Sequence, residues 1–212
     1  MQSVETKGSV IHSAARYDLL IWLLTLGREG RLRERQLSLA GLRPGESVLD
    51  VGCGTGGLAI AASRKVGSAG SVQGVDPSAA MIARAQRKAR RAAADVQFRT
   101  GVAEALPYGD ATFDVVLSSL MLHHLPKETR RAGVREVGRV LKPGGRFLAI
   151  DFGRPSSEHK HGLIGRLHRH GGVNARNLIE LVSDAGLEVV DSGPTGTWDL
   201  QFVLAKRPTS PA

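Results

Sequence analysis

Cysteine and long apolar runs are scarce in this sequence, and each scarcity excludes a class of protein. The 212 residues include one cysteine, so the chain cannot form an internal disulfide or a metal site built from several thiolates. The longest apolar run, residues 19–24, is far shorter than the ~20 residues that cross a bilayer. The first residues also lack the order of a secretory signal. We therefore expect a cytoplasmic protein.

Acidic residues are outnumbered by basic ones, which leaves a net charge of +9 and a pI near 10.4. Such a balance suits nucleic acid, an anionic membrane or an acidic substrate, but a basic surface exposed to solvent explains it equally well. An apolar share of 42% with 23% charged residues is typical of a globular protein. The length predicts a single α/β domain.

Glycine is concentrated at one point, in the segment Val48-Leu49-Asp50-Val51-Gly52-Cys53-Gly54-Thr55-Gly56-Gly57-Leu58-Ala59. This pattern predicts a buried strand, a tight loop and the start of a helix, where backbone N–H groups can approach a small ligand. The glycines also fit the dinucleotide pattern G-x-G-x-x-G. Asp50, however, would repel a pyrophosphate and suits a positively charged ligand group better.

A second predicted strand, residues 71–76, ends in an acid as well. Asp76 lies 24 residues after Gly52, where a doubly wound fold places an acid that accepts hydrogen bonds from ribose hydroxyls. The residues therefore predict a ligand that contains a nucleoside, without distinguishing a dinucleotide from other nucleosides.

The segment from Val48 to Ala59 resembles the first motif of the class I S-adenosylmethionine-dependent methyltransferases, and Arg139 to Phe152 resembles their third motif. Four motifs follow the family's order, and the resemblance covers residues 13–207. Residues 17–20 (Tyr-Asp-Leu-Leu), 26–27 (Leu-Gly) and 152–155 (Phe-Gly-Arg-Pro) look like the ubiquinone/menaquinone biosynthesis C-methyltransferases in particular. The chain departs from them at Ile21, where they usually have Asn, and in a shorter region after the fifth strand.

This resemblance implies a doubly wound α/β fold with a seven-stranded, mostly parallel sheet, an antiparallel last strand and an N-terminal helical lid. We expect one domain over residues 1–212. Its parts are a lid at 13–43, a cofactor-binding core at 44–152, and a substrate-side insertion with closing strands at 153–212. Within these parts the patterns predict helices over 13–27, 28–39, 79–93 and 174–185 and closing strands over 187–190 and 200–205.

The resemblance also implies S-adenosyl-L-methionine as cofactor and S-adenosyl-L-homocysteine as product. Asp50 would hold the methionyl end, Asp76 the ribose, and Ser118 would line the methionyl side. The expected cofactor-binding residues are Asp50, Gly52, Cys53, Gly54, Thr55, Gly56, Asp76, Pro77, Met81, Val102, Ala103, Glu104 and Ser118.

Residues 101–108 resemble the segment that contacts adenine in this family. The acid that usually accepts from the adenine amine is Val102 here. The backbone at Val102 and Ala103 would serve instead, with Glu104 as a substitute acid, and we expect weaker selectivity for adenine.

Two residues are candidates for catalysis. Tyr17 would close over the sulfonium, and His123 is a candidate base, although a histidine that merely packs in its loop fits the sequence equally well. The reaction is an in-line displacement that needs no metal. The histidines between residues 159 and 170 could bind a metal ion, or they could belong to a basic insertion exposed to solvent. We favour the exposed insertion.

The methyl acceptor stays open at this point. A quinone precursor or another small, lipid-like molecule is the first hypothesis, and a phospholipid or other small-molecule N- or O-methyltransferase is the second. A module that binds the cofactor without turnover is the third, with Val102 as its only hint. Residues 118–121 lack the motif of DNA amino-methyltransferases, so we expect no nucleic acid partner. The apolar residues 17–26 beside several arginines would suit peripheral contact with a membrane.

Overall fold

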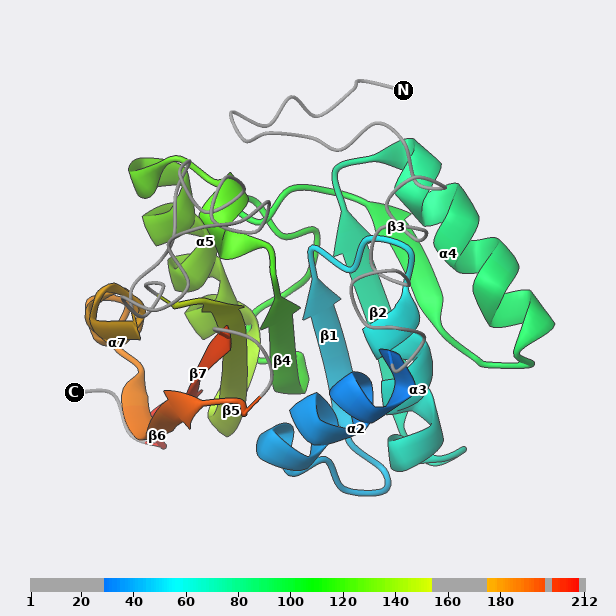
Figure 1. The fold of residues 1–212 in the computed structure, drawn as a ribbon, viewed down its shortest axis with the longest axis horizontal. Helices are drawn as coiled ribbons and strands as arrows, with labels where there is room; N and C mark the ends of the chain where they lie inside the picture. The colour runs from blue at the N-terminus through cyan, green and yellow to red at the C-terminus, as the bar shows by residue number, and fades with distance from the viewer. Residues whose placement is uncertain (1–28, 154–174, 197–199, 210–212) are drawn as a thin grey trace.

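The computed structural model describes residues 29–153, 175–196 and 200–209 (Figure 1). The helix expected over 13–27, with Tyr17, lies outside the described residues, and so does the histidine-rich stretch over 159–170. The division into lid, core and insertion therefore stays a prediction.

Seven strands form one sheet in the order β3-β2-β1-β4-β5-β7-β6. Their bounds are Ser47–Val51 (β1), Ser71–Asp76 (β2), Gln97–Thr100 (β3), Phe113–Ser119 (β4), Leu141–Phe152 (β5), Glu188–Pro194 (β6) and Leu200–Lys206 (β7). β7 pairs antiparallel with both β5 and β6, whereas the first five strands pair parallel. The predicted fold is confirmed, including the reversed last strand.

The central strands are buried on both faces, which is why they read as continuous apolar runs rather than as alternating ones. Four of the five residues of β1 are buried, and so are Val115, Val116 and Leu117 of β4. A sheet of this kind needs a layer of helices on each face.

Helices supply both layers, as Figure 1 shows. Their bounds are Glu29–Ala40 (α2), Gly57–Val66 (α3), Ala79–Arg91 (α4), Lys127–Val140 (α5) and Ala175–Ser183 (α7). Buried residues of α2, α3 and α4 pack with Val48 and Leu117 on one face of the sheet. Buried residues of α5 and α7 pack with Leu49 and Val116 on the other face. Because neighbouring strand residues point to opposite faces, this division also shows which way each site residue faces.

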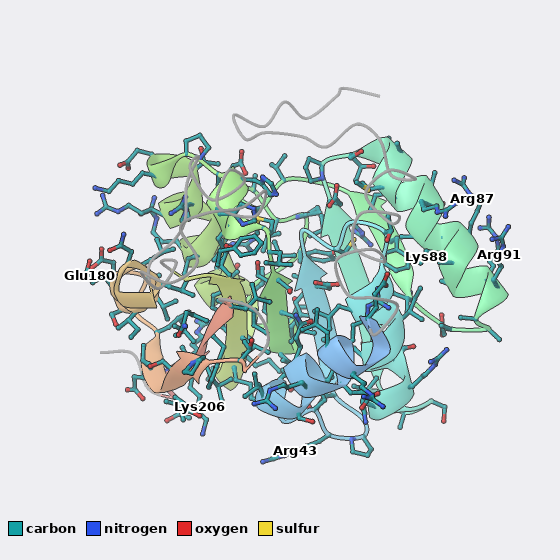
Figure 2. All side chains as sticks on the ribbon, viewed as in Figure 1. Arg43, Arg87, Lys88, Arg91, Glu180 and Lys206 are labelled. Carbon is teal, nitrogen blue, oxygen red and sulfur yellow. The ribbon has the colours of Figure 1, made fainter. Side chains whose placement is uncertain are left out.

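The basic helix α4 is explained by its position. Its N-cap is Ser78, whose side chain accepts from the amide of Met81. Arg87 and Arg91 are exposed and point away from the sheet (Figure 2), and cations in a last turn are favoured by the helix dipole. Within the described ranges, no helix is both long enough and apolar enough to cross a membrane.

The glycine loop follows β1, which lies between β2 and β4. The strand order reverses at this point, and the carboxyl ends of β1, β2, β4 and β5 meet at one edge of the sheet. Open α/β sheets bind their ligands at such an edge.

Candidate functional site

The glycine loop is fastened to β2 by its own backbone. The amides of Gly52 and Cys53 both donate to the carbonyl of Val75, at 2.8 and 3.0 Å. The amide of Gly54 donates to Oδ2 of Asp76 at 2.9 Å. These bonds hold the loop directly beside the acid at the end of β2.

Gly52 is required for two reasons. Its φ is +72°, a backbone conformation that side chains disfavour, and a Cβ placed there would lie 2.2 Å from Cγ of Met121. Met121 follows β4, so the glycine lets the β4 loop close against the β1 loop. The neighbouring Cys53 is 9% exposed, and burial raises the pKa of its thiol well above the usual value, which fits a small packing residue.

Asp76 is held by two amides. In addition to Gly54, the amide of Ser78 donates to its Oδ1 at 2.9 Å. Burial raises the pKa of the Asp76 carboxyl, and the two amides act against this shift. An ionised carboxylate offers about four lone-pair positions, so Asp76 can still accept from hydroxyl groups of a ligand.

Asp50 is 2% exposed and only partly satisfied. One oxygen accepts from the amide of Ala59 in α3, whereas Oδ2 is buried without a hydrogen-bond partner. Burial, with a smaller contribution from Asp76, raises the pKa of Asp50 to about 7. A cationic group near Oδ2 would supply the missing partner and favour the ionised form.

Thr55, Met81 and Ser118 are less directly placed. Thr55 accepts from the Lys88 ammonium at 2.9 Å, so its hydroxyl faces α4. Met81 is buried in the first turn of α4. Ser118 is buried, and its Oγ has no partner. Alternation along β4 puts Ser118 on the α5 face, opposite to the face of Asp50.

The segment expected to contact adenine begins beside Asp76, because the Gly101 amide donates to the Asp76 carbonyl at 3.2 Å. Val102 is 3% exposed and forms an isolated bridge with Ala105. Ala103 packs against Gly133 of α5. Asp76 and this segment are therefore neighbours, and their binding of ribose and adenine stays a prediction.

His123 forms a close pair with Asp151, the penultimate residue of β5. It belongs to a short 3-10 helix, η1 (Leu122–His124). Its Nδ1 lies 2.6 Å from Oδ1 of Asp151, and its backbone amide donates to Oδ2 at 2.9 Å. The amide of Phe152 also donates to Oδ1 at 2.8 Å. Asp151 is fully buried, whereas the His123 side chain is 18% exposed. The imidazole is thus oriented by a buried carboxylate while one side remains accessible.

The ring of His123 has two aromatic neighbours. The ring of His124 lies 3.9 Å away between centroids, and that of Phe152 lies 5.2 Å away in an edge contact. Burial lowers the pKa of His124 to about 4, with a further contribution from His123, so His124 is neutral at physiological pH.

Sequence reasoning missed Asp151. The available signal was an acid at the carboxyl end of a parallel strand, the same signal that identified Asp76. It also missed Met121 and the contact in which Gln36 of α2 donates to Ser119 at 3.0 Å.

These residues fit S-adenosylmethionine. The orphaned Oδ2 of Asp50 suits the ammonium of the methionyl end, and Asp76 suits the ribose. Gly52 leaves no side chain between the ligand and the loop. Among the described residues no cluster of three or more His, Cys, Asp or Glu side chains could hold a metal ion.

Comparison with known proteins supports this fit. A family model described as a methyltransferase domain matches residues 48–145. The ubiquinone/menaquinone biosynthesis C-methyltransferase UbiE of Enterobacter sp. (strain 638) is 31% identical over 217 aligned positions, which cover 90% of this chain and 86% of that protein. UbiE of Escherichia fergusonii is 34% identical with the same coverage.

Solved structures agree on the fold. A SAM-dependent methyltransferase from Aquifex aeolicus superposes with a TM-score of 0.71 at 24% identity and covers 82% of this chain and 89% of that one. The magnesium protoporphyrin IX methyltransferase of Synechocystis PCC 6803, determined with bound SAH, superposes with a TM-score of 0.68 at 23% identity. The superposition covers 86% of this chain and 87% of that one. Together with the glycine loop and its two acids, these relatives show that the chain belongs to the class I S-adenosylmethionine-dependent methyltransferases, close to the ubiquinone/menaquinone biosynthesis C-methyltransferases.

Proposed function

We propose that this methyltransferase acts on a carbon or oxygen of a small aromatic acceptor of the quinone-precursor type, which loses a proton as it is methylated. The observation that carries this proposal is the His123–Asp151 pair, which lies at the same edge of the sheet as the glycine loop. The names of the relatives point to the same class of acceptor.

The tautomer of His123 follows from its partner. An ionised carboxylate only accepts hydrogen bonds, so the short contact to Asp151 requires that Nδ1 carries the hydrogen. The lone pair on Nε2 is then free to accept a proton. Asp151 also stabilises the imidazolium that results, as a buried carboxylate does for other catalytic histidines.

S-adenosylmethionine supplies an activated methyl group when bound. On the protein side, Nε2 of His123 takes the proton of the acceptor hydroxyl while the new bond to the methyl forms, either at that oxygen or at an activated ring carbon. A methylated ring carbon then loses its own hydrogen as a proton when the ring becomes aromatic again, and the oxygen is protonated again. The neutral His124 adds no positive charge beside the imidazolium. Alignment of donor and acceptor in a dry site contributes most of the acceleration, and such positioning is worth up to ~7 to 11 kcal/mol.

Methylation of an amine, such as a phospholipid headgroup, is the second candidate. A neutral amine attacks through its own lone pair, so it needs no base during the transfer. The oriented imidazole therefore favours an acceptor that bears a removable proton.

Release of S-adenosylhomocysteine by the full chain tests the proposal. The probes are a soluble naphthohydroquinone, its dimethyl ether as the acceptor without a hydroxyl proton, and vesicles of phosphatidylethanolamine as the amine. We expect turnover with the hydroquinone and none with the ether. Turnover with the amine vesicles alone would overturn the proposal in favour of N-methylation.

A lipid-like acceptor would reach the site from a membrane surface, so we also propose peripheral contact with anionic bilayers. In the described residues this rests on the exposed Arg31 and Arg35 of α2. Each basic residue near an anionic membrane contributes ~1 kcal/mol. Co-sedimentation with anionic vesicles should therefore rise with anionic lipid and fall with salt. Absence of binding at low salt would move the acceptor to a water-soluble molecule.

A further inference from the structure

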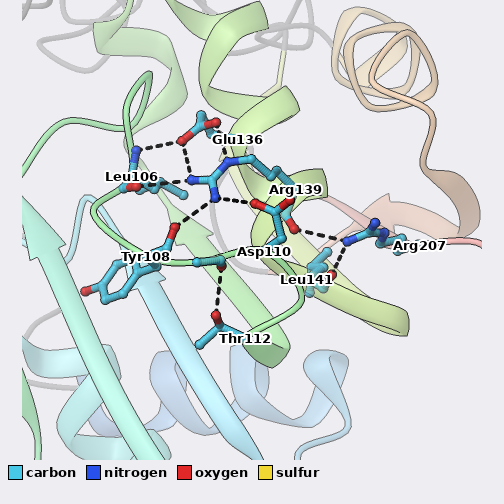
Figure 3. Close-up of polar contacts among 9 residues, drawn as sticks. Leu106, Tyr108, Asp110, Thr112, Glu136, Arg139, Leu141 and Arg207 are labelled. Carbon is cyan, nitrogen blue, oxygen red and sulfur yellow. Dashed lines mark hydrogen bonds and ion pairs between the residues drawn. The ribbon is translucent and has the colours of Figure 1, made fainter.

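Arg139 lies in the last turn of α5 and uses all five of its N–H groups (Figure 3). Nε and Nη2 donate to the two oxygens of Glu136, each at 2.7 Å. Nη1 donates to Oδ1 of Asp110 at 2.8 Å. The remaining two donate to the backbone carbonyls of Tyr108 at 2.8 Å and Leu106 at 3.1 Å. One guanidinium thus binds both its own helix and the loop before β4.

The same loop is held through its amides. The Leu106 amide donates to Oε2 of Glu136 at 2.8 Å, so both backbone groups of Leu106 are bonded to this pair of side chains. The Ala111 amide donates to the carbonyl of Arg139 at 3.0 Å. That carbonyl also accepts from Arg207, which follows β7. Residues 106–111 are therefore fixed to α5 at several points.

The cluster is charged at neutral pH. Arg139 lowers the pKa of Glu136 through direct hydrogen bonds, and Glu136 with Asp110 raises the pKa of Arg139. The Arg139 side chain is 31% exposed, and exposed ion pairs contribute only ~0 to 1 kcal/mol to folding. Because the stability gained is small, the more specific effect of this cluster is the conformation that it imposes on the loop.

That loop continues directly from residues 102–105. These residues are the part of the expected adenine-contacting segment (101–108) that includes Val102, Ala103 and Glu104, and they are called the adenine wall. The wall is held by the Gly101–Asp76 hydrogen bond at its start and by the Arg139 cluster just after its end. Val102 offers no polar side chain to the base, so recognition of adenine would fall to the backbone groups of this segment, with Glu104 as a substitute acid. Backbone groups select a base only when their positions are fixed, because a mobile segment loses ordering entropy on binding.

We propose that Arg139 is a positioning residue of the cofactor site, which fixes the backbone of residues 102–105 so that it can recognise the adenine amine. The inference rests on the proposed role of this segment as the adenine wall. It predicts that changes at Arg139 reduce discrimination of the base more than they reduce folding.

Calorimetric titration of the full chain with two probes tests this role. The probes are S-adenosylhomocysteine and its inosine counterpart, in which oxygen replaces the adenine amine. We expect the parent to prefer the adenine form. Arg139→Gln should weaken adenine-form binding roughly tenfold, the loss of one or two hydrogen bonds, and inosine-form binding less than twofold. Arg139→Lys keeps the positive charge but not the planar guanidinium with its five donors, so this variant should lose most of the preference for adenine as well.

Two further variants make the test independent of folding. Asp110→Asn removes the charge of an exposed partner, and it should reduce the preference about twofold. Arg131→Gln, on the same helix with ion pairs to Glu128 and Asp184, should leave the preference unchanged.

An unchanged preference in Arg139→Gln and Asp110→Asn would overturn the proposal, and so would a parent that does not prefer adenine. Turnover of the hydroquinone at saturating donor reports separately on the proposed function. If Arg139→Gln loses the preference for adenine but retains turnover, the positioning role is supported. If the parent itself shows no turnover, that result counts against the proposed function and not against the positioning role.

Discussion

The donor side and the acceptor side of the site are held in different ways. On the proposed donor side, Asp76 is fixed by the amides of Gly54 in the glycine loop and of Ser78 at the start of α4, and Asp50 is fixed by an amide of α3. On the proposed acceptor side, His123 and Asp151 lie 28 residues apart in the chain, and their side chains contact each other, while the Asp151 carboxylate also accepts from the amides of His123 and Phe152. The acids of the proposed donor side are thus held by backbone amides, whereas the proposed acceptor side also depends on a contact between two side chains.

This difference suggests that the two sides can change independently. A substitution of His123 or Asp151 would alter the proposed acceptor chemistry, whereas the hydrogen bonds that hold the glycine loop to β2 involve neither residue. A substitution in the glycine loop alters both the fold and donor binding. The predictions below separate the two sides, and the largest expected effect comes first.

His123→Ala should reduce turnover ~10²- to 10⁴-fold, the usual contribution of a general base. Affinity for S-adenosylhomocysteine should stay within twofold, because His123 belongs to the acceptor side. Initial rates and calorimetry measure the two quantities. His124→Ala is the matched control, and we expect it to retain most of the activity. A loss of donor affinity as large as the loss of turnover would contradict the division into a donor side and an acceptor side.

Asp76→Ala should have the opposite signature. Donor binding should weaken by roughly 1.5 to 3 kcal/mol, the range for hydrogen bonds to a charged group, while turnover at saturating donor is retained. Asp95→Ala, an exposed acid just before β3, serves as the control in the same calorimetric titration. Equal affinity of Asp76→Ala and the parent would remove Asp76 from the site.

Gly52→Ala should destabilise the fold and weaken donor binding together. A side chain at positive φ costs about 1 to 3 kcal/mol, and at Gly52 the added methyl also meets Met121. Gly45→Ala is the comparison, since Gly45 has a φ of +85° but open space around it. Denaturant unfolding should show a larger loss for Gly52→Ala. Similar losses of stability in both variants would mean that the Met121 side chain can move aside at little cost in free energy.

Donor binding should depend on pH through Asp50. Its pKa is raised from 3.8 to about 7, so the ligand-free protein binds more protons than the unfolded chain between these values. This contribution makes the folded protein less stable as pH rises through that window. The cofactor's ammonium favours the ionised carboxylate, so affinity should rise with pH, at most about tenfold per unit below the pKa. Calorimetry at several pH values should show this slope, and Asp50→Asn should flatten it.

Local patterns were sufficient to predict the elements that carry the proposed donor side. The glycine run, the N-cap Ser78 and the acids at the ends of β1 and β2 each act within a few residues, so their structural meaning can be read directly from the sequence. The expected strand over 71–76 matches β2, whereas β6 runs to Pro194, four residues beyond the expected strand over 187–190. α4 ends at Arg91, two residues earlier than expected.

His123 was a candidate base from the sequence, but its pairing with Asp151 could not be predicted in this way. Leu120, after β4, has a φ of +56°, which is uncommon for a residue with a side chain. It lies at the turn that leads into η1, where His123 meets Asp151, and no pattern around a leucine indicates such a turn. Two of the five acceptor atoms of Arg139 belong to Glu136 on its own helix, but the other three lie in the loop before β4, 29 to 33 residues earlier, so only the assembled fold brings helix and loop together (Figure 3).

The position of β7 sets the order in which the site can be completed during synthesis. β6 pairs only with β7 within the described sheet, and β7 lies between β5 and β6 although it is made after both. Until β7 is inserted, β5 has an unpaired edge, and Asp151 has no Gln201 opposite it. The parallel strands that hold the cofactor loop need no later segment of the chain. A nascent chain can therefore form the proposed donor side before β7 is made, whereas the strand that carries Asp151 gains its second neighbour only after residues 200–206 have been synthesised.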